Sequence, residues 1–101
     1  MLKPNFEEID LGELKFGEPK HFNFILTNTS ETPIEINRLI MGCMSCTTAR
    51  ASKQIVLPKE DVSIDAVFTP GSTGIASKSI YVIWNNRELK LKFKANISAK
   101  N

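Results

Sequence analysis

Both cysteines of the chain fall in the segment MGCMSC, residues 41–46, where a methionine precedes them by two positions. Thiolates and thioethers are the soft ligands that bind Cu(I), so Met41, Cys43 and Cys46 are candidate metal ligands. The same thiols could instead form a local disulfide, or a reversible redox pair activated by a nearby cation such as Arg50. They could also pack as small apolar groups in a loop at the end of the fold. We predict packing without a bound metal, and keep Cu(I) binding or redox cycling at Cys43 and Cys46 as the alternative hypothesis.

The sequence lacks some of the residues that a zinc site, a catalytic triad or a phosphate-binding loop would need. A structural zinc site needs four ligands, whereas the chain offers two thiols and one distant histidine, His21. A catalytic Ser-His-Asp or Cys-His arrangement would also depend on His21, which we expect to point outward from a strand. The segment PGSTG lacks the lysine and the helix of a phosphate-binding loop, and Asp61 and Asp65 have no acidic neighbour in sequence. We therefore predict that the protein is not an enzyme and takes no cofactor or small-molecule substrate.

Length and composition describe a small globular protein. The 101 residues suffice for one core, so we predict a single domain over residues 1–101. The net charge of +2 is too small to attract nucleic acid through bulk electrostatics, and we expect no nucleic-acid partner. The chain has no apolar run of the roughly 18 residues that a membrane span needs, and its N-terminus lacks a signal-peptide core. We expect a cytoplasmic or virion location, with export only if a leader was removed.

Alternation of apolar and polar residues predicts β-strands along most of the chain. The clearest case is the last segment, in which apolar side chains alternate with lysines, as on a strand with one buried face. The predicted strands are FEEIDLGELKFG (6–17, broken at Gly12), HFNFILTN (21–28), TPIEINRLI (32–40), KQIVLP (53–58), DVSIDAVFTP (61–70), SKSIYVIWNN (77–86) and RELKLKFKANIS (87–98). Leu39 to Met41 could also form one helical turn before Gly42.

About seven short strands separated by turn residues predict an all-β fold, an immunoglobulin-like antiparallel β-sandwich. The pair Asn85-Asn86 tolerates positive φ and should form the two-residue turn of the last hairpin. The residues expected to point into the core are Phe22, Phe24, Leu26, Ile34, Ile36, Val62, Ile64, Ala66, Phe68, Ile80, Val82, Trp84, Leu89, Leu91, Phe93, Ala95 and Ile97.

Two features suggest where a partner would bind. Tyr81 and Ile83 fall on the face opposite the core in a strand that we expect at the centre of its sheet, and a partner subunit would cover them. Lys90, Lys92 and Lys94 form a basic stripe on the last strand, which either keeps that strand soluble or meets an acidic partner. The five residues are our candidate partner contacts, either with another protein or in self-assembly.

Several fragments, in this order, resemble the bacterial and phage family called domain of unknown function 1573, in the Hydin-like and major-sperm-protein-like group of immunoglobulin-type sandwiches. They are IDLGELKFGEPKHFNFILTNTSETPIEI (9–36), CMSCTTARAS (43–52) and LPKEDVSIDAVFTPGSTGIASKSIYVIWNNRELKLKFKANI (57–97). The family's usual Cys-Gly-Cys-Thr is replaced here by Cys-Met-Ser-Cys-Thr, so Cys46-Thr47 matches while Cys43 is displaced by one residue. The resemblance implies the same fold and a non-catalytic role in binding or assembly, such as a structural or accessory subunit of a phage virion.

Overall fold

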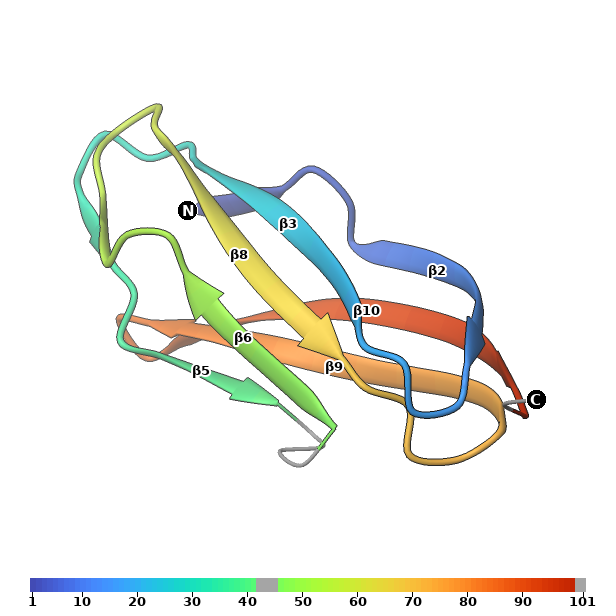
Figure 1. The fold of residues 1–101 in the computed structure, drawn as a ribbon. Coiled ribbons are helices and arrows are strands. Elements are labelled where there is room, and N and C mark those ends of the chain that lie inside the picture. The colour runs from blue at the N-terminus through green and yellow to red at the C-terminus, as the bar shows by residue number, and fades with distance from the viewer. Residues whose placement is uncertain (42–45, 100–101) are drawn as a thin grey trace.

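The computed structural model describes residues 1–41 and 46–99, which contain strands and no helix. Two four-stranded sheets pack face to face, and a two-stranded sheet lies at one end (Figure 1). The strands are β1 (Leu2–Pro4), β2 (Glu8–Lys15), β3 (Lys20–Asn28), β4 (Ile34–Glu35), β5 (Arg38–Met41), β6 (Thr47–Ala51), β7 (Ile55–Val56), β8 (Asp61–Phe68), β9 (Gly74–Trp84) and β10 (Arg87–Ser98).

The first sheet has the strand order β1-β3-β8-β6, and the second sheet has the order β2-β10-β9-β5. The N-terminal segment contributes β1 to the first sheet and then β2 to the second, so it runs along one margin of both. This arrangement confirms the predicted immunoglobulin-like β-sandwich. Among the described residues, no helix has the length and apolarity of a membrane span.

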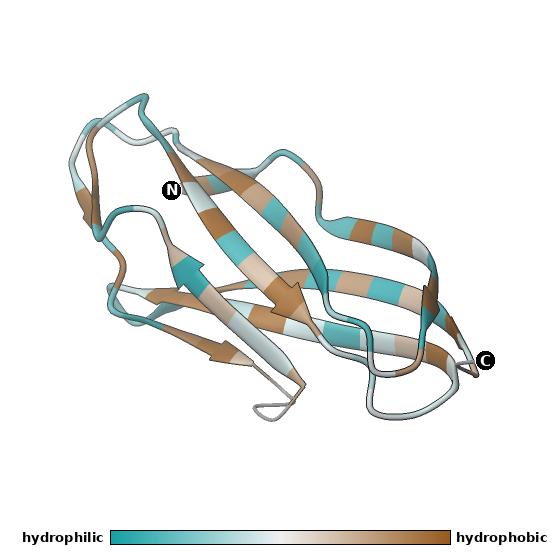
Figure 2. Ribbon diagram, viewed as in Figure 1, coloured by the Kyte–Doolittle hydropathy of each residue, from teal (hydrophilic) through white to brown (hydrophobic). Residues whose placement is uncertain are grey.

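The core lies between the two sheets, where one side of every long strand is apolar. Figure 2 shows apolar and polar bands alternating along these strands. The predicted inward residues are buried or, for Phe22 and Leu89, partly buried and packed against the core. Phe93 sits at the centre of an aromatic group, with its ring centroid 4.8 Å from that of Phe22 and 5.3 Å from that of Phe68. Alternation therefore predicted the buried face of both sheets.

The last two strands form the expected hairpin. Asn85 and Asn86 have φ values of 46° and 60°, which gives the two-residue turn its left-handed backbone. Trp84 faces Arg87 across the turn, and the pairing continues to Gly74 and Ile97. β9 also pairs with β5, so it is an inner strand of its sheet, as predicted.

The segment TPIEINRLI is two strands instead of the predicted one. β4 pairs with β7, and the chain then changes partner: the Ile36 N–H still donates to the Gln54 carbonyl, whereas the Asn37 N–H donates to the Ile83 carbonyl. Residues Leu39 to Met41 consequently belong to β5, and the helical turn considered for them is wrong. Pairing with β9 satisfies the backbone groups on the side of β5 that faces it, and this pairing outweighs any local helical preference.

Three further features were not evident from the sequence pattern. β1 is too short to show alternation, and β6 is not among the strands predicted from the sequence. Gly12 does not break the opening strand; it has φ of 76° and lies where the pairing of β2 with β10 shifts register, as in a β-bulge. The β2–β10 pair is also parallel, unlike the other pairs of the two large sheets.

Candidate interaction surface

An apolar patch lies on the outer face of the second sheet. Tyr81 and Ile83 both point outward from β9 and are half-buried by their neighbours, as the alternation predicted. Ile40 on β5 lies directly opposite Tyr81 and is 38% exposed. We call Ile40, Tyr81 and Ile83 the apolar patch. Sequence reasoning missed Ile40 because a helical turn was considered there; its position next to Tyr81 follows only from the β5–β9 register.

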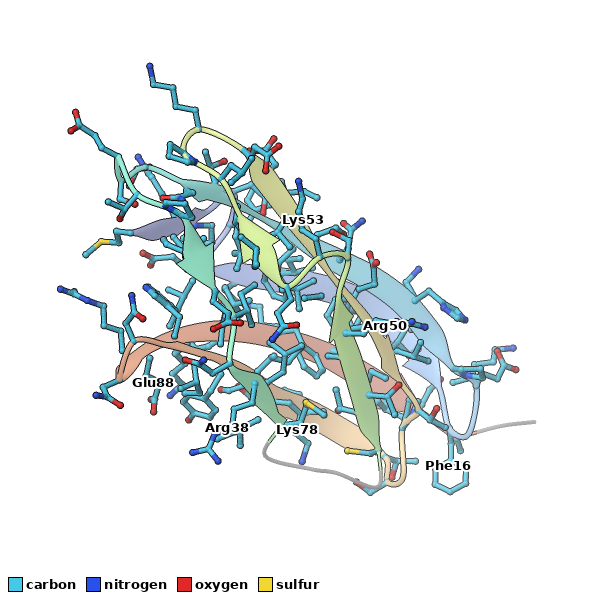
Figure 3. The ribbon with its side chains drawn as sticks, turned by 90° about the vertical axis from the view of Figure 1, so that its left-hand side faces the viewer. Phe16, Arg38, Arg50, Lys53, Lys78 and Glu88 are labelled. Carbon is cyan, nitrogen blue, oxygen red and sulfur yellow. The ribbon has the colours of Figure 1, made fainter. Side chains whose placement is uncertain are left out.

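Charged side chains surround this patch. Lys90 on β10 faces Tyr81, and its Nζ lies 5.9 Å from the centroid of the tyrosine ring. Such a cation–π contact at an exposed position stabilises by about 0.5–1 kcal/mol. Arg38 and Glu88 flank Ile83 on the two neighbouring strands, and both are labelled in Figure 3. An apolar centre with a polar rim is the common composition of a protein–protein interface.

The predicted lysine stripe faces a row of carboxylates within the same sheet. Lys92 lies opposite Glu8 and Lys94 opposite Asp10, because β2 runs parallel to β10. The Nζ of Lys94 is 3.8 Å from Oε1 of Glu8, an exposed ion pair whose contribution is below about 1 kcal/mol. The stripe is therefore partly neutralised along β2, and Lys90 is the lysine of the stripe that contacts the apolar patch.

The thiol segment is described only in part. Met41 and Cys46 are both half-buried and pack against the core, and Cys46 Sγ is 3.6 Å from Oγ1 of the buried Thr47. Cys43 lies outside the described residues, so the structure does not test the pair. Within residues 1–41 and 46–99, no group of three or more His, Cys, Asp or Glu side chains could hold a metal ion. Both the packing and the thiol-site hypotheses stay predictions.

The outer face of the first sheet carries the chain's single histidine. His21 is exposed on β3, as predicted, beside an open hollow of about 760 Å³. The two aspartates on the same face each accept a hydrogen bond from a hydroxyl: Asp61 from Thr27 Oγ1 and Asp65 from Ser63 Oγ, both at 2.6 Å. These carboxylates are held by hydroxyls and do not form an acid–base pair with each other.

One buried polar residue was overlooked in the sequence. Asn28 is fully buried at the end of β3, and its side-chain Nδ2 donates to the carbonyl oxygens of Thr32 and Val56, both at 2.9 Å. Its Oδ1 accepts from the backbone N–H and from the hydroxyl of Ser30. All four hydrogen-bonding positions of the amide are thus used. The signal was available, because Asn28 continues the inward series of Phe24 and Leu26 along the strand.

These features define an immunoglobulin-like β-sandwich domain with a partly apolar sheet face. The chain belongs to the family described as "Protein of unknown function (DUF1573)", whose sequence model matches residues 2–97. The family resemblance seen in the sequence is therefore confirmed. No curated protein matches the sequence.

Solved structures share the fold at low sequence identity. A Porphyromonas gingivalis W83 protein of unknown function has a TM-score of 0.82 and 17% identity, covering 94% of this chain and 46% of its own length. This chain thus spans about half of that protein. PapD-like domain 7 of human CEP192 has a TM-score of 0.72 and 10% identity, covering 99% of this chain and 87% of that chain. WR4, a Caenorhabditis elegans MSP family member, has a TM-score of 0.65 and 10% identity, covering 97% and 98%. At these identities the similarity shows the fold alone.

Proposed function

We propose that the chain is a non-catalytic protein–protein interaction module whose partner packs on the apolar patch. The observation that carries this proposal is the clustering of Ile40, Tyr81 and Ile83 on the outer face of one sheet, although the core is complete without them. A contiguous apolar surface rimmed by charges is a common mark of a binding site. Tyrosine is also enriched among the residues that dominate binding energy.

The charges on the rim of the patch favour one kind of partner. Arg38, Lys90 and Lys92 contribute positive charge around or next to it, and Glu88 contributes one negative charge. A partner surface with a protruding apolar side chain surrounded by acidic residues would match this pattern. A sheet face is also flat, which suits a folded protein surface better than a small molecule, whose sites are concave.

A role in a larger assembly is the finer form of this proposal. In it, the chain is a structural or accessory subunit, for example of a phage virion, and the apolar patch attaches it to the assembly. Its support is the small size of the domain and the bacterial and phage family that the sequence resembles. Mass spectrometry of purified particles from the source would test this form, which requires the chain to be present in stoichiometric amount.

Site-specific photocrosslinking tests the proposed surface. A photoreactive phenylalanine analogue at position 81 should crosslink the partner, because position 81 lies within the contact. The matched control position is 75, because Ile75 is also outward on β9 but lies at the other end of the strand and is 86% exposed. Equal crosslinking from both positions, or crosslinking from position 75 alone, would refute the patch as the contact surface.

A further inference from the structure

Apart from one charged side chain, that of Arg50, the edge strand β6 lacks the features that usually protect a sheet edge. Unpaired edges offer free backbone groups, and proteins commonly block them with very short strands, prolines, bulges or charged side chains, above all lysines. β1 is three residues long and ends in Pro4, and β2 carries the bulge at Gly12. β6 has the sequence TTARA, with no proline, glycine or lysine. Among the described strands, only β8 pairs with it.

Two backbone hydrogen bonds show which backbone groups of β6 face β8. The Thr69 N–H donates to the Cys46 carbonyl and the Ser52 N–H to the Ser63 carbonyl, both at 2.8 Å. In an antiparallel pair, residues that bond to the neighbouring strand alternate with residues whose N–H and C=O point away. Because residues 46 and 52 both bond to β8, the even-numbered residues between them also bond to β8.

Thr48 and Arg50 are these even-numbered residues, and they lie opposite Val67 and Asp65 of β8. The N–H and C=O groups of Ala49 and Ala51 must then point to the open side. Their methyl side chains are half-buried on the inner face and leave room for a neighbouring backbone. The open side of β6 thus offers a row of hydrogen-bonding groups that an extended chain can reach.

The positive charge of Arg50 favours some partners for this strand edge over others. Arg50 is exposed, and Figure 3 shows it pointing away from β5. Within residues 1–41 and 46–99 it forms no ion pair, although Asp65 faces it across the β6–β8 pair and accepts a hydrogen bond from Ser63. A second copy pairing through β6 would bring two Arg50 side chains opposite or diagonal to each other, which is unfavourable.

We propose that β6 is a strand-addition site for an extended, acidic segment of a partner protein. The segment would pair with Ala49 and Ala51 through its backbone and place a carboxylate beside Arg50, over the hollow lined by His21, Thr48 and Val67. Its side chains on the other face would be apolar and would cover the half-buried margin of the sandwich. This site is separate from the apolar patch and does not depend on it.

A pair of synthetic peptides tests the proposal. One is a capped peptide of about eight residues that alternates valine and glutamate, and the other has lysine in place of glutamate. The acidic peptide should protect the amides of Ala49 and Ala51 from hydrogen exchange in NMR spectra. It should also bind about fivefold to tenfold more tightly than the basic peptide, and Arg50→Glu should reverse the preference. Equal binding of the two peptides, binding of neither, or protection elsewhere would overturn the proposal.

A proline substitution tests the backbone contact itself. Ala49→Pro removes an N–H that faces away from β8, so the domain keeps its own ladder while the peptide loses a hydrogen bond and about tenfold or more in affinity. Should this variant not fold, N-methylation of alternate peptide amides gives the same test on the unchanged protein. Methylation of the peptide amides that face β6 should abolish binding, and methylation of the amides that face away from β6 should not. Unchanged binding in both tests would contradict strand addition, whereas Tyr81→Ala with Ile83→Ala should leave peptide binding intact.

Discussion

The side chain of Lys90 reaches across from β10 to Tyr81 on β9, with its Nζ 5.9 Å from the centroid of the tyrosine ring. This contact joins the basic stripe to the apolar patch, so the two features inferred separately from the sequence form one surface. Lys90 contacts the ring from β10, and Ile40 lies next to Tyr81 on β5, the strand on the other side of β9. Such a surface presents an aromatic side chain that is already partly ordered before a partner binds.

Lys90→Gln should lower the free energy of unfolding by no more than about 1 kcal/mol, because the cation–π contact is exposed to solvent. A double-mutant cycle with Tyr81→Leu should recover a coupling energy of that size. Lys92→Gln is the matched control, since Lys92 faces Ser79 and has no aromatic ring opposite it. Equal coupling of Lys90 and Lys92 to Tyr81 would show that the contact adds nothing specific.

Asn28→Ala should destabilise the domain by about 2–4 kcal/mol, because it leaves the Thr32 and Val56 carbonyl oxygens without their donor in a buried region. Urea denaturation measures this loss. Asn23→Ala on the same strand is the control, because Asn23 is exposed and its removal should change stability by less than about 0.5 kcal/mol. Similar effects of the two substitutions would refute the structural role of Asn28.

Gly12→Ala should cost about 1–2 kcal/mol, because an alanine at a φ of 76° is strained even though there is space for its methyl group. Gly71→Ala offers a matched comparison, since its added methyl group also meets nothing within 4 Å and its backbone is not left-handed. That change should be neutral or slightly stabilising in a thermal melt. A neutral Gly12→Ala would argue against the bulge in β2.

Protein purified under nitrogen should carry no stoichiometric copper if Met41, Cys43 and Cys46 only pack or form a local disulfide. Metal analysis and intact mass with and without reductant distinguish these states, because a disulfide lowers the mass by two hydrogens. Replacing Cys43 and Cys46 by serine should leave partner binding unchanged. One copper per chain, lost on this replacement, would establish the thiol site in place of the packing hypothesis.

The sequence predicted the strands that are long and buried on one face. It predicted less about which residues lie side by side on the surface, because strand pairing determines that. Leu91 and Phe93 alternate with lysines, so β10 and its buried face were evident. Ile40 was not assigned to the surface, because its neighbour Tyr81 lies 41 positions away and becomes adjacent only through the β5–β9 register. The carboxylate of Glu8 beside the lysines was missed for the same reason. Asn28 was missed although its inward position on the strand was visible, because only apolar residues were expected in the core.

The dissociation constant of the partner complex measures the central claim most directly, once crosslinking has identified the partner. Tyr81→Ala with Ile83→Ala should weaken binding by about thirtyfold or more, since the loss of even one hot-spot side chain costs at least about 2 kcal/mol. The circular dichroism spectrum should stay that of a folded sandwich. Ile75→Ala, on the same face of the same strand, should leave the constant unchanged. If the double variant binds as tightly as the unmodified chain, the apolar patch is not the interaction surface.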